Sequence, residues 1–174
     1  MIDGLNGLCA SLCLVCFTGI IYMINADTVP SLFPLILPVG AIMGFLMYNL
    51  GVLGNQRTVF LGDNGSNALG FMCAWILVYF SSVENSNFAP VTALWFVAIP
   101  FFDAVGVMAS RAIKGIMPLR PGRDHLHHKL LDMGLSSNAI YVVLIFTSAL
   151  FAAIGYIFNH SLPGSHYISF YTFI

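Results

Sequence analysis

Three histidines and three of the six Lys and Arg residues fall within ten positions, 120–129, between two long hydrophobic runs. Their order is Arg-Pro-Gly-Arg-Asp-His-Leu-His-His-Lys. Imidazoles can transfer protons near neutral pH, and guanidinium groups bind phosphate through paired N–H donors. Because the chain carries few charges, ionisable residues beside a membrane segment are candidates for function. The segment therefore predicts an anion site, with phosphate as the obvious anion.

The histidines are expected on a short amphipathic helix at about residues 125–133. Asp124 is a suitable N-cap and Gly134 a suitable stop for this helix. An apolar stripe would pack it onto the protein: Leu126, Leu130 and Met133. Another face would carry His125, His128 and Asp132. The helix N-terminus, flanked by Arg120 and Arg123, would favour an anion.

Two other interpretations of this segment stay open. The imidazoles are possible zinc ligands, although no cysteine accompanies them in the loop. Alternatively, the segment is a solvated basic loop that only sets membrane topology.

A second candidate is the motif Phe-Leu-Gly-Asp-Asn-Gly-Ser, which spans residues 60–66 directly before a hydrophobic run. Asp63 or Ser66 would cap the following helix in a purely structural interpretation. In a functional interpretation, Gly62 and Gly65 let the backbone approach a ligand, and Asp63 is an oxygen ligand for a divalent cation. The motif lacks the Gly-Lys-Ser/Thr ending of a P-loop.

A third candidate is Asp103, which lies inside an apolar run three residues after Pro100. A carboxylate in that position should face other helices. Its role is either to stabilise helix packing or to support the site from beneath, and Pro100 predicts a kink in the same run.

The elements that must position these residues are membrane helices. Apolar residues make up 59% of the chain and charged residues 7%, far from the balance of a soluble domain. Runs of about 17–25 residues can span a bilayer, and five occur, at 8–24, 32–52, 66–82, 91–109 and 139–158. A sixth begins near Tyr167 and is cut short at Ile174. The predicted fold is one all-α membrane domain over residues 1–174, and the composition gives no reason to expect nucleic-acid binding.

The positive charges predict the orientation. With five spans, all six Lys and Arg residues fall in loops on the side of the N-terminus: Arg57, Arg111, Lys114, Arg120, Arg123 and Lys129. The positive-inside rule assigns these loops to the cytoplasm. The polar clusters near Asp3, Asp63 and His125 would then meet at one membrane face, as in sites built from several helices.

The motifs together resemble the polyprenyl-phosphate N-acetylhexosamine-1-phosphate transferase family. The resemblance rests on Asp-Gly-Leu-Asn-Gly at 3–7, the 60–66 motif, Pro-Phe-Phe-Asp at 100–103 and Arg-Asp-His-Leu-His-His at 123–128, in that order. Segments 48–54 and 90–95 resemble the family's bacterial members. The resemblance implies transfer of GlcNAc-1-phosphate from UDP-GlcNAc to undecaprenyl phosphate at the cytoplasmic face of the bacterial inner membrane. It also implies Mg²⁺, with Mn²⁺ as a substitute, and a product that feeds surface polysaccharides such as lipopolysaccharide O-antigen.

The resemblance also implies roles for individual residues. Asp63 matches the metal-binding, catalytic carboxylate, and Phe60 matches a ring that stacks on uracil. The strip that lines the nucleoside pocket would comprise Asp3, Gly4, Leu5 and Asn6. The catalytic motif that contacts phosphate or sugar would comprise His125, His127 and His128, with Arg120 and Arg123 as further substrate-binding residues.

Three positions depart from the family pattern. The family's paired Asp-Asp is absent, the second acid of the nucleoside strip is Asn6, and Gly122 stands where relatives often carry Asp. The chain thus resembles the C-terminal portion of the enzyme, and we expect it to be inactive by itself. Its expected partners are membrane lipid and either a second copy of the chain or a separately encoded N-terminal half.

Two alternatives come from other functional classes. In the first, the chain is a non-catalytic membrane partner that completes a site with that separate half. A small metal transporter using the histidine loop is a weaker alternative, because only Asp103 lies at mid-membrane depth.

Overall fold

The computed structural model describes residues 5–24, 33–54, 59–82, 89–117, 122, 124–161 and 172–173. Within these ranges every regular element is a helix, so the all-α prediction is confirmed. The helices are α1 (Leu8–Met23), α2 (Phe33–Asn49), α3 (Gly62–Ser82), α4 (Pro90–Phe96), α5 (Ala98–Ile113), α6 (Leu126–Asp132) and α7 (Ser137–Ser161).

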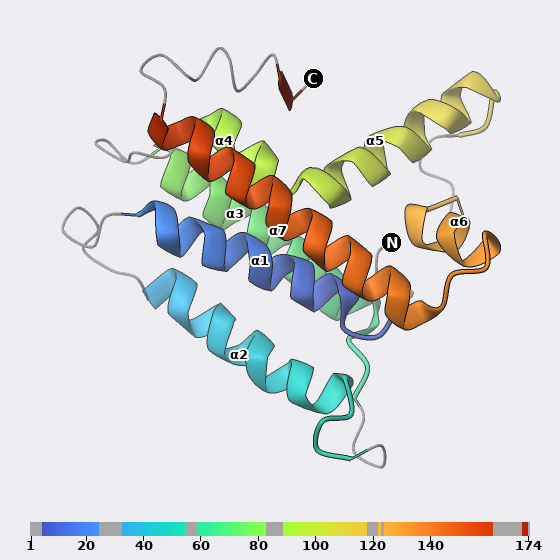
Figure 1. Ribbon diagram of the computed structural model, residues 1–174, viewed down its shortest axis with the longest axis horizontal. Helices are drawn as coiled ribbons and strands as arrows, with labels where there is room; N and C mark the ends of the chain where they lie inside the picture. Colours follow the sequence, from blue (N-terminus) through green and yellow to red (C-terminus); the bar gives the residue numbers. More distant parts are fainter. Residues whose placement is uncertain are drawn as a thin grey trace.

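Helix α1 lies at the centre of the bundle and contacts α2, α3, α4 and α7 (Figure 1). Its sequence is apolar on all sides, which is the pattern of a helix surrounded by others. Phe17 and Ile20 are fully buried in the main core, together with Phe80 of α3 and Phe96 of α4. A second core joins the start of α1 to α7, where Leu8 packs with Ile140.

Two glycines let the short helix α4 pack closely against its neighbours. A Cβ at Gly19 of α1 would lie 2.9 Å from the ring of Phe96, and one at Gly155 of α7 would lie 2.5 Å from the Cβ of Trp95. A hydrogen bond adds to this packing, because the Thr92 hydroxyl donates to Asn159 Oδ1 at 2.9 Å. Helix α4 is thereby fixed between α1 and α7.

The fourth hydrophobic run is broken. The prediction of one helix over 91–109 was wrong in this respect, because α4 and α5 meet at Val97 with a bend of 83°. Pro100 supplies the physical reason: its ring clashes with the carbonyl four residues earlier, at Phe96, where α4 ends. The kink predicted from Pro100 is therefore present, one turn before the proline itself.

Membrane-spanning capacity is clearest for α7, whose residues 137–160 are long and apolar enough to cross a bilayer. The bent pair α4 and α5 passes the same test when taken together, and α1 and α2 are shorter apolar helices. Large apolar side chains such as Tyr22, Phe71 and Phe146 are exposed on the outer surface, as a lipid environment favours. The count of five spans stays a prediction, and most of the sixth candidate, near Tyr167, lies outside the described residues.

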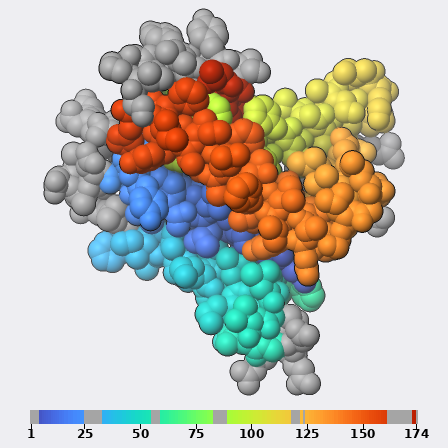
Figure 2. Space-filling model, in the orientation of Figure 1, coloured from blue at the N-terminus to red at the C-terminus, as the bar shows by residue number. Residues whose placement is uncertain are grey.

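The polar motifs gather at one end of the bundle. Figure 1 shows the starts of α1, α3 and α7, the end of α2 and helix α6 at this end. Figure 2 shows the side chains of α6 and α7 as one continuous orange band, which the yellow end of α5 reaches from above. The described cations Arg111, Lys114 and Lys129 follow or belong to α5 and α6, and therefore lie at this end as well.

Candidate functional site

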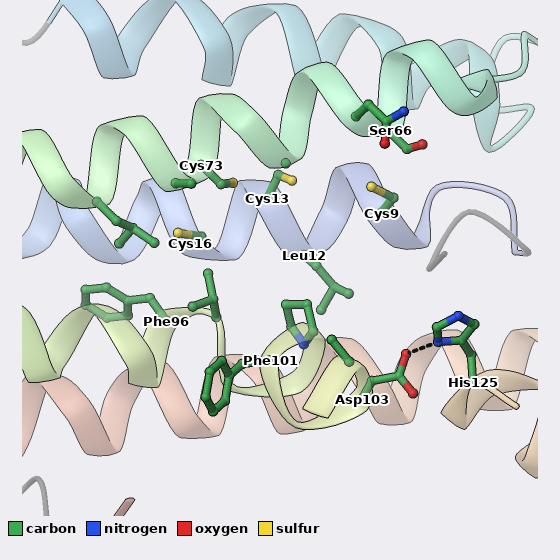
Figure 3. A pocket seen from close by; sticks show the side chains of 17 residues that line it. Cys9, Leu12, Cys13, Cys16, Ser66, Cys73, Phe96, Phe101, Asp103 and His125 are labelled. Atoms are coloured by element: carbon green, nitrogen blue, oxygen red, sulfur yellow. Dashed lines mark hydrogen bonds and ion pairs between the residues drawn. The ribbon is translucent and has the colours of Figure 1, made fainter. Parts of the chain in front are cut away.

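A cavity of about 490 Å³ opens between α1, α3 and the bent pair α4 and α5. Most of its wall is apolar: Leu12, Cys13, Cys16, Leu77, Phe96 and Phe101. One end is polar and is lined by Ser66, Asn67, Asp103 and His125. Figure 3 shows the thiols of α1 facing Cys73 of α3 on one side, Phe96 and Phe101 on the other, and the pair Asp103 and His125 at one end.

The cavity brings two predicted motifs together. Ser66 closes the motif at 60–66, and His125 opens the histidine motif. Both line the same polar end although they are far apart in sequence. The two motifs therefore lie at the same end of the bundle, in agreement with the prediction that they meet.

Asp103 is the best-connected side chain at this end. Its Oδ2 lies 2.8 Å from His125 Nδ1, and its Oδ1 accepts a 2.7 Å hydrogen bond from the backbone N–H of Leu126. Both side chains are almost fully buried, with 6% of Asp103 and 8% of His125 exposed. The carboxylate therefore faces other elements, as predicted, and it links α5 to the first residue of α6.

The predicted capping of α6 by Asp124 was wrong. The cap position is His125, and Asp124 instead pairs with Arg111 at the end of α5, with Asp124 Oδ2 2.8 Å from the guanidinium Nη2. The Arg111 guanidinium holds the pKa of the exposed Asp124 carboxyl below its ordinary value. A Cβ at Gly122 would lie 2.5 Å from Arg111 Nη2, so glycine fits beside this ion pair.

The predicted helix and its glycine stop are confirmed, and the predicted apolar stripe is confirmed except at Met133. The helix spans Leu126–Asp132, and Gly134 follows with a φ of 89° that favours glycine. Leu126 and Leu130 pack against the second core, whereas Met133 is 74% exposed. The first N–H of α6 is already bonded to Asp103, so it is not available to the predicted anion site, whose Arg120 and Arg123 lie outside the described residues.

The other two histidines differ in burial. His127 is only 2% exposed, and within the described structure its Nε2 has no hydrogen-bond partner. Burial, together with the nearby His128, lowers the pKa of His127 below the ordinary value for imidazole. The rings of His127 and His128 lie 4.2 Å apart between centroids, and His128 is half-buried.

The motif at 60–66 forms the first turn of α3. The predicted start at residue 66 was wrong, because the helix begins at Gly62, whose φ of 67° favours glycine. Asp63 thus lies in the first turn with its side chain exposed, and the Ser66 hydroxyl donates to the Asp63 carbonyl at 3.1 Å. Phe60 precedes the helix and is 75% exposed, which leaves its ring free to stack on a ligand.

Half of the predicted nucleoside strip is described. Leu5 is buried in the second core and Asn6 is exposed, whereas Asp3 and Gly4 lie outside the described residues. Gly7 follows with a φ of 75° and packs so closely on α2 that a Cβ there would lie 2.7 Å from the Leu50 side chain. This contact places the strip beside the end of α2.

Asn49 was missed by sequence reasoning. It is 4% exposed at the last position of α2, and its Nδ2 donates to the carbonyl of Val59 at 2.6 Å, directly before Phe60. A Cβ at Gly7 would lie 3.3 Å from its Oδ1. Asn49 is therefore bonded to the segment just before the motif at 60–66 and lies beside Gly7, and within the described structure its buried Oδ1 has no hydrogen-bond partner. The signal for it was a single amide near the end of an apolar run.

The described residues bear on the metal predictions as well. Within them, no group of three His, Cys, Asp or Glu side chains is placed to hold a metal ion. A Mg²⁺ ion needs fewer protein ligands than such a group provides, because it is commonly held by one or two carboxylates together with substrate phosphates and water. The exposed Asp63 carboxylate fits that mode of binding.

Comparison with known proteins gives consistent results. Residues 1–81 match glycosyl transferase family 4. The undecaprenyl-phosphate alpha-N-acetylglucosaminyl 1-phosphate transferase of Escherichia coli (strain K12) is 36% identical over 167 residues, which are 94% of this chain and 45% of that protein. The transferases of the same name from Yersinia pestis and Pasteurella multocida (strain Pm70) are 36% and 40% identical over 90% and 66% of this chain.

These relatives are longer than the chain, which spans about half the length of the curated relatives that it matches over most of its residues. No solved structure matches the chain. The order of the motifs and the sequence between them therefore lead to one conclusion: residues 1–81 resemble the glycosyl transferase family 4 enzymes, and the chain is similar, over nearly all of its own length, to about half of an undecaprenyl-phosphate alpha-N-acetylglucosaminyl 1-phosphate transferase.

Proposed function

We propose that this chain takes part in the transfer of GlcNAc-1-phosphate from UDP-GlcNAc to undecaprenyl phosphate at the cytoplasmic face of the bacterial inner membrane. The observation that carries the proposal is the cavity of about 490 Å³, apolar along its length and polar at the end where two family motifs meet. The relatives are named for this reaction, which supports the same substrates here.

The cavity has the chemistry of a polyprenyl phosphate site. Its apolar wall, which includes Leu12 and Phe101, suits an isoprenoid chain, because burying apolar surface is favourable by about 25 cal/mol per Å². The phosphate would lie at the polar end, near Ser66, Asn67 and His125. Ser66 and Asn67 offer hydroxyl and amide donors, and donors of this kind satisfy a phosphate taken from water.

The nucleotide would lie beside this end, over the start of α3. Phe60 would stack on the uracil, as the family resemblance implies, with Asn6 and Leu5 close to the nucleoside. The Asn49 side chain is hydrogen-bonded to the Val59 carbonyl and lies against Gly7, so it would help to keep the strip and the ring of Phe60 side by side.

In the reaction, a phosphate oxygen of undecaprenyl phosphate forms a bond to the phosphorus that carries the sugar. The bond from that phosphorus to the UMP oxygen breaks, and UMP leaves with the electron pair. Mg²⁺ bound at Asp63 would neutralise negative charge on the diphosphate. His125 would bind the attacking phosphate, and the buried groove would keep water away from it.

We further propose that turnover needs more than residues 1–174, because the sequence contains no Asp-Asp pair. A non-catalytic membrane partner is the second candidate, and the same missing pair favours it. Both proposals predict that a second polypeptide carrying the paired acids restores activity.

The test measures lipid-linked GlcNAc-1-phosphate in membranes that contain residues 1–174, either alone or with the remainder of the Escherichia coli relative expressed separately. We expect little product from the chain alone and Mg²⁺-dependent product from the combination. Asp63→Asn should lower that product by about 10²–10³-fold, as for loss of a group that stabilises transition-state charge. The matched control is Asp132→Asn, which changes an exposed carboxylate on α6.

Robust turnover by the chain alone would overturn the proposed need for the paired acids. Failure of the combination to make product, with both polypeptides present in the membrane, would overturn the proposed reaction.

A further inference from the structure

We propose that Asp103 is a positioning residue that fixes the ring orientation and the tautomer of His125. In this arrangement the proton is on Nδ1, and the unprotonated Nε2 is the acceptor that His125 offers to a protonated oxygen of a phosphate ligand in the cavity. The significance for catalysis depends on the proposed function, whereas the tautomer itself does not.

The two hydrogen bonds of Asp103 define the proton positions. The backbone N–H of Leu126 can only donate, so Asp103 Oδ1 must accept its 2.7 Å bond. The other oxygen, Oδ2, lies 2.8 Å from His125 Nδ1. With a carboxylate as acceptor, Nδ1 carries the proton, and in the neutral ring Nε2 is then an acceptor.

The location of Asp103 and His125 in the cavity shows where Nε2 of His125 points. Asp103 and His125 both line the polar end of the cavity. Figure 3 shows the second ring nitrogen of His125 on the side away from Asp103, toward the side of the cavity where Ser66 lies. Because only 8% of the His125 side chain is exposed, neighbouring atoms surround the ring, and it cannot rotate freely to exchange the positions of its two nitrogens.

Helix anchoring alone does not explain a carboxylate at position 103. Helix α6 is already held by the packing of Leu126 and Leu130 on the second core and by the ion pair between Arg111 and Asp124. A buried carboxylate is costly unless its oxygens are satisfied. Only a carboxylate offers two acceptor oxygens of equal kind, one for the cap of α6 and one for Nδ1.

Asparagine at position 103 separates two roles of the carboxylate: accepting the backbone N–H of Leu126 and accepting the proton of His125 Nδ1. The amide oxygen of Asp103→Asn can still accept from the Leu126 N–H, which preserves the cap of α6. Its NH₂ group would then face Nδ1 as a donor, so the proton of the neutral ring would move to Nε2. The variant should therefore keep the fold and reverse the tautomer.

The test uses the full chain with ¹⁵N-labelled histidine in lipid bilayers, at a pH where the His125 ring is neutral. The His125 signals are assigned by their loss in His125→Gln, and the shifts show which nitrogen carries the proton. We expect Nδ1–H in the wild-type protein and Nε2–H in Asp103→Asn, with unfolding midpoints that remain similar. Asp124→Asn is the matched control, because it changes the neighbouring carboxylate and should leave the His125 tautomer as in the wild type.

A kinetic measurement provides a second readout in any preparation that shows turnover. Asp103→Asn should lower kcat by about 10²-fold or more with little change in KM, the effect of a mis-set proton-transfer group. Asp103→Glu should recover part of this loss.

Two results would overturn the proposal: Nε2–H in the wild-type protein, or Nδ1–H retained in Asp103→Asn. Absence of turnover in every preparation would instead count against the proposed function. The NMR result would still decide the role of Asp103.

Discussion

The buried polar residues near the polar end of the cavity differ in how fully their polar atoms are hydrogen-bonded. Asp103 has both oxygens hydrogen-bonded, and His125 shares one of those bonds. His127 is equally buried, but in the described structure its Nε2 has no partner. An unsatisfied buried nitrogen costs stability, which is tolerated where a ligand supplies the missing bond.

His127 should make stability depend on pH. Its pKa is lowered in the folded protein, so between this lower pKa and about 6.5 the unfolded chain binds more protons. The free energy of unfolding should therefore be highest above pH 6.5, fall as the pH drops through this window, and level off below the folded-state pKa. His127→Gln should flatten the profile.

The measurement is the unfolding midpoint in detergent micelles between pH 5 and 8, approximately the range in which histidine titrates. His160→Gln is the control, since His160 is exposed at the other end of α7. An unchanged slope in His127→Gln would contradict the burial of a neutral imidazole.

At the scale of elements, hydrophobic runs predicted the helices and a proline predicted where one of them breaks. Pro100 ends α4 at Phe96, and the 83° bend sends α5 away from the core so that Asp103 reaches α6. Helix α4 remains fixed because glycines on α1 and α7 make room for Phe96 and Trp95. The bend between α4 and α5 and the glycine contacts of α4 together set the orientation of α5.

Gly155→Ala should destabilise the bundle. The new Cβ would lie 2.5 Å from the Cβ of Trp95, which is not the flexible end of a side chain. Forcing α4 and α7 apart should cost about 1–3 kcal/mol, the usual range for overpacking. Unfolding in mixed micelles measures the difference from the wild-type protein.

The matched control is Gly40→Ala, in the middle of α2, where a Cβ would meet nothing within 4 Å. It should be neutral or stabilise by up to about 1 kcal/mol, because alanine favours helix. Equal effects of the two substitutions would show that α4 and α7 do not pack as closely as the structure indicates.

The helices of the molecule surround the cavity, which has one polar end. Cavity walls come from α1, α3, α4 and α5, and the polar end adds His125 at the start of α6. Several neighbouring helices must therefore be in place before the groove exists. This shape suits an amphiphilic substrate with a long apolar tail and a charged head.

Narrowing the cavity should weaken binding of the lipid substrate and leave binding of the nucleotide sugar nearly unchanged. Gly70 lines the cavity, and a Cβ there would meet nothing within 4 Å, so Gly70→Leu is expected to fold and to narrow the groove. We expect the Kd for undecaprenyl phosphate to rise by about tenfold, which corresponds to about 1.4 kcal/mol. The Kd for UDP-GlcNAc should change little, because its proposed site lies outside the apolar wall.

Binding of both ligands to the protein in nanodiscs provides the measurement. Gly40→Leu is the control, since Gly40 is exposed on α2 and does not line the cavity. Unchanged binding of the lipid by Gly70→Leu would show that the isoprenoid chain lies elsewhere.

The sequence by itself determined the helical class, the position of most apolar helices and the residue types of the predicted site. These are local properties: hydrophobic run length predicts a membrane helix, and motifs such as residues 60–66 keep their residue types whatever surrounds them. The helix over Leu126–Asp132 and its glycine stop were predictable for the same reason. The roles of all the predicted site residues stay predictions, and four of these residues lie outside the described ranges: Asp3, Gly4, Arg120 and Arg123.

Only the tertiary structure decided which groups meet. Asp124 was the nearest acid to α6, yet Asp103, 23 residues before Leu126, caps the helix. Asn49 donates to the Val59 carbonyl and lies beside Gly7 although neither is its neighbour in sequence. A hydrogen bond depends on the distance and angle between two groups in space, and those are fixed only when the bend at Val97 and the close packing at Gly19 and Gly155 have oriented the helices.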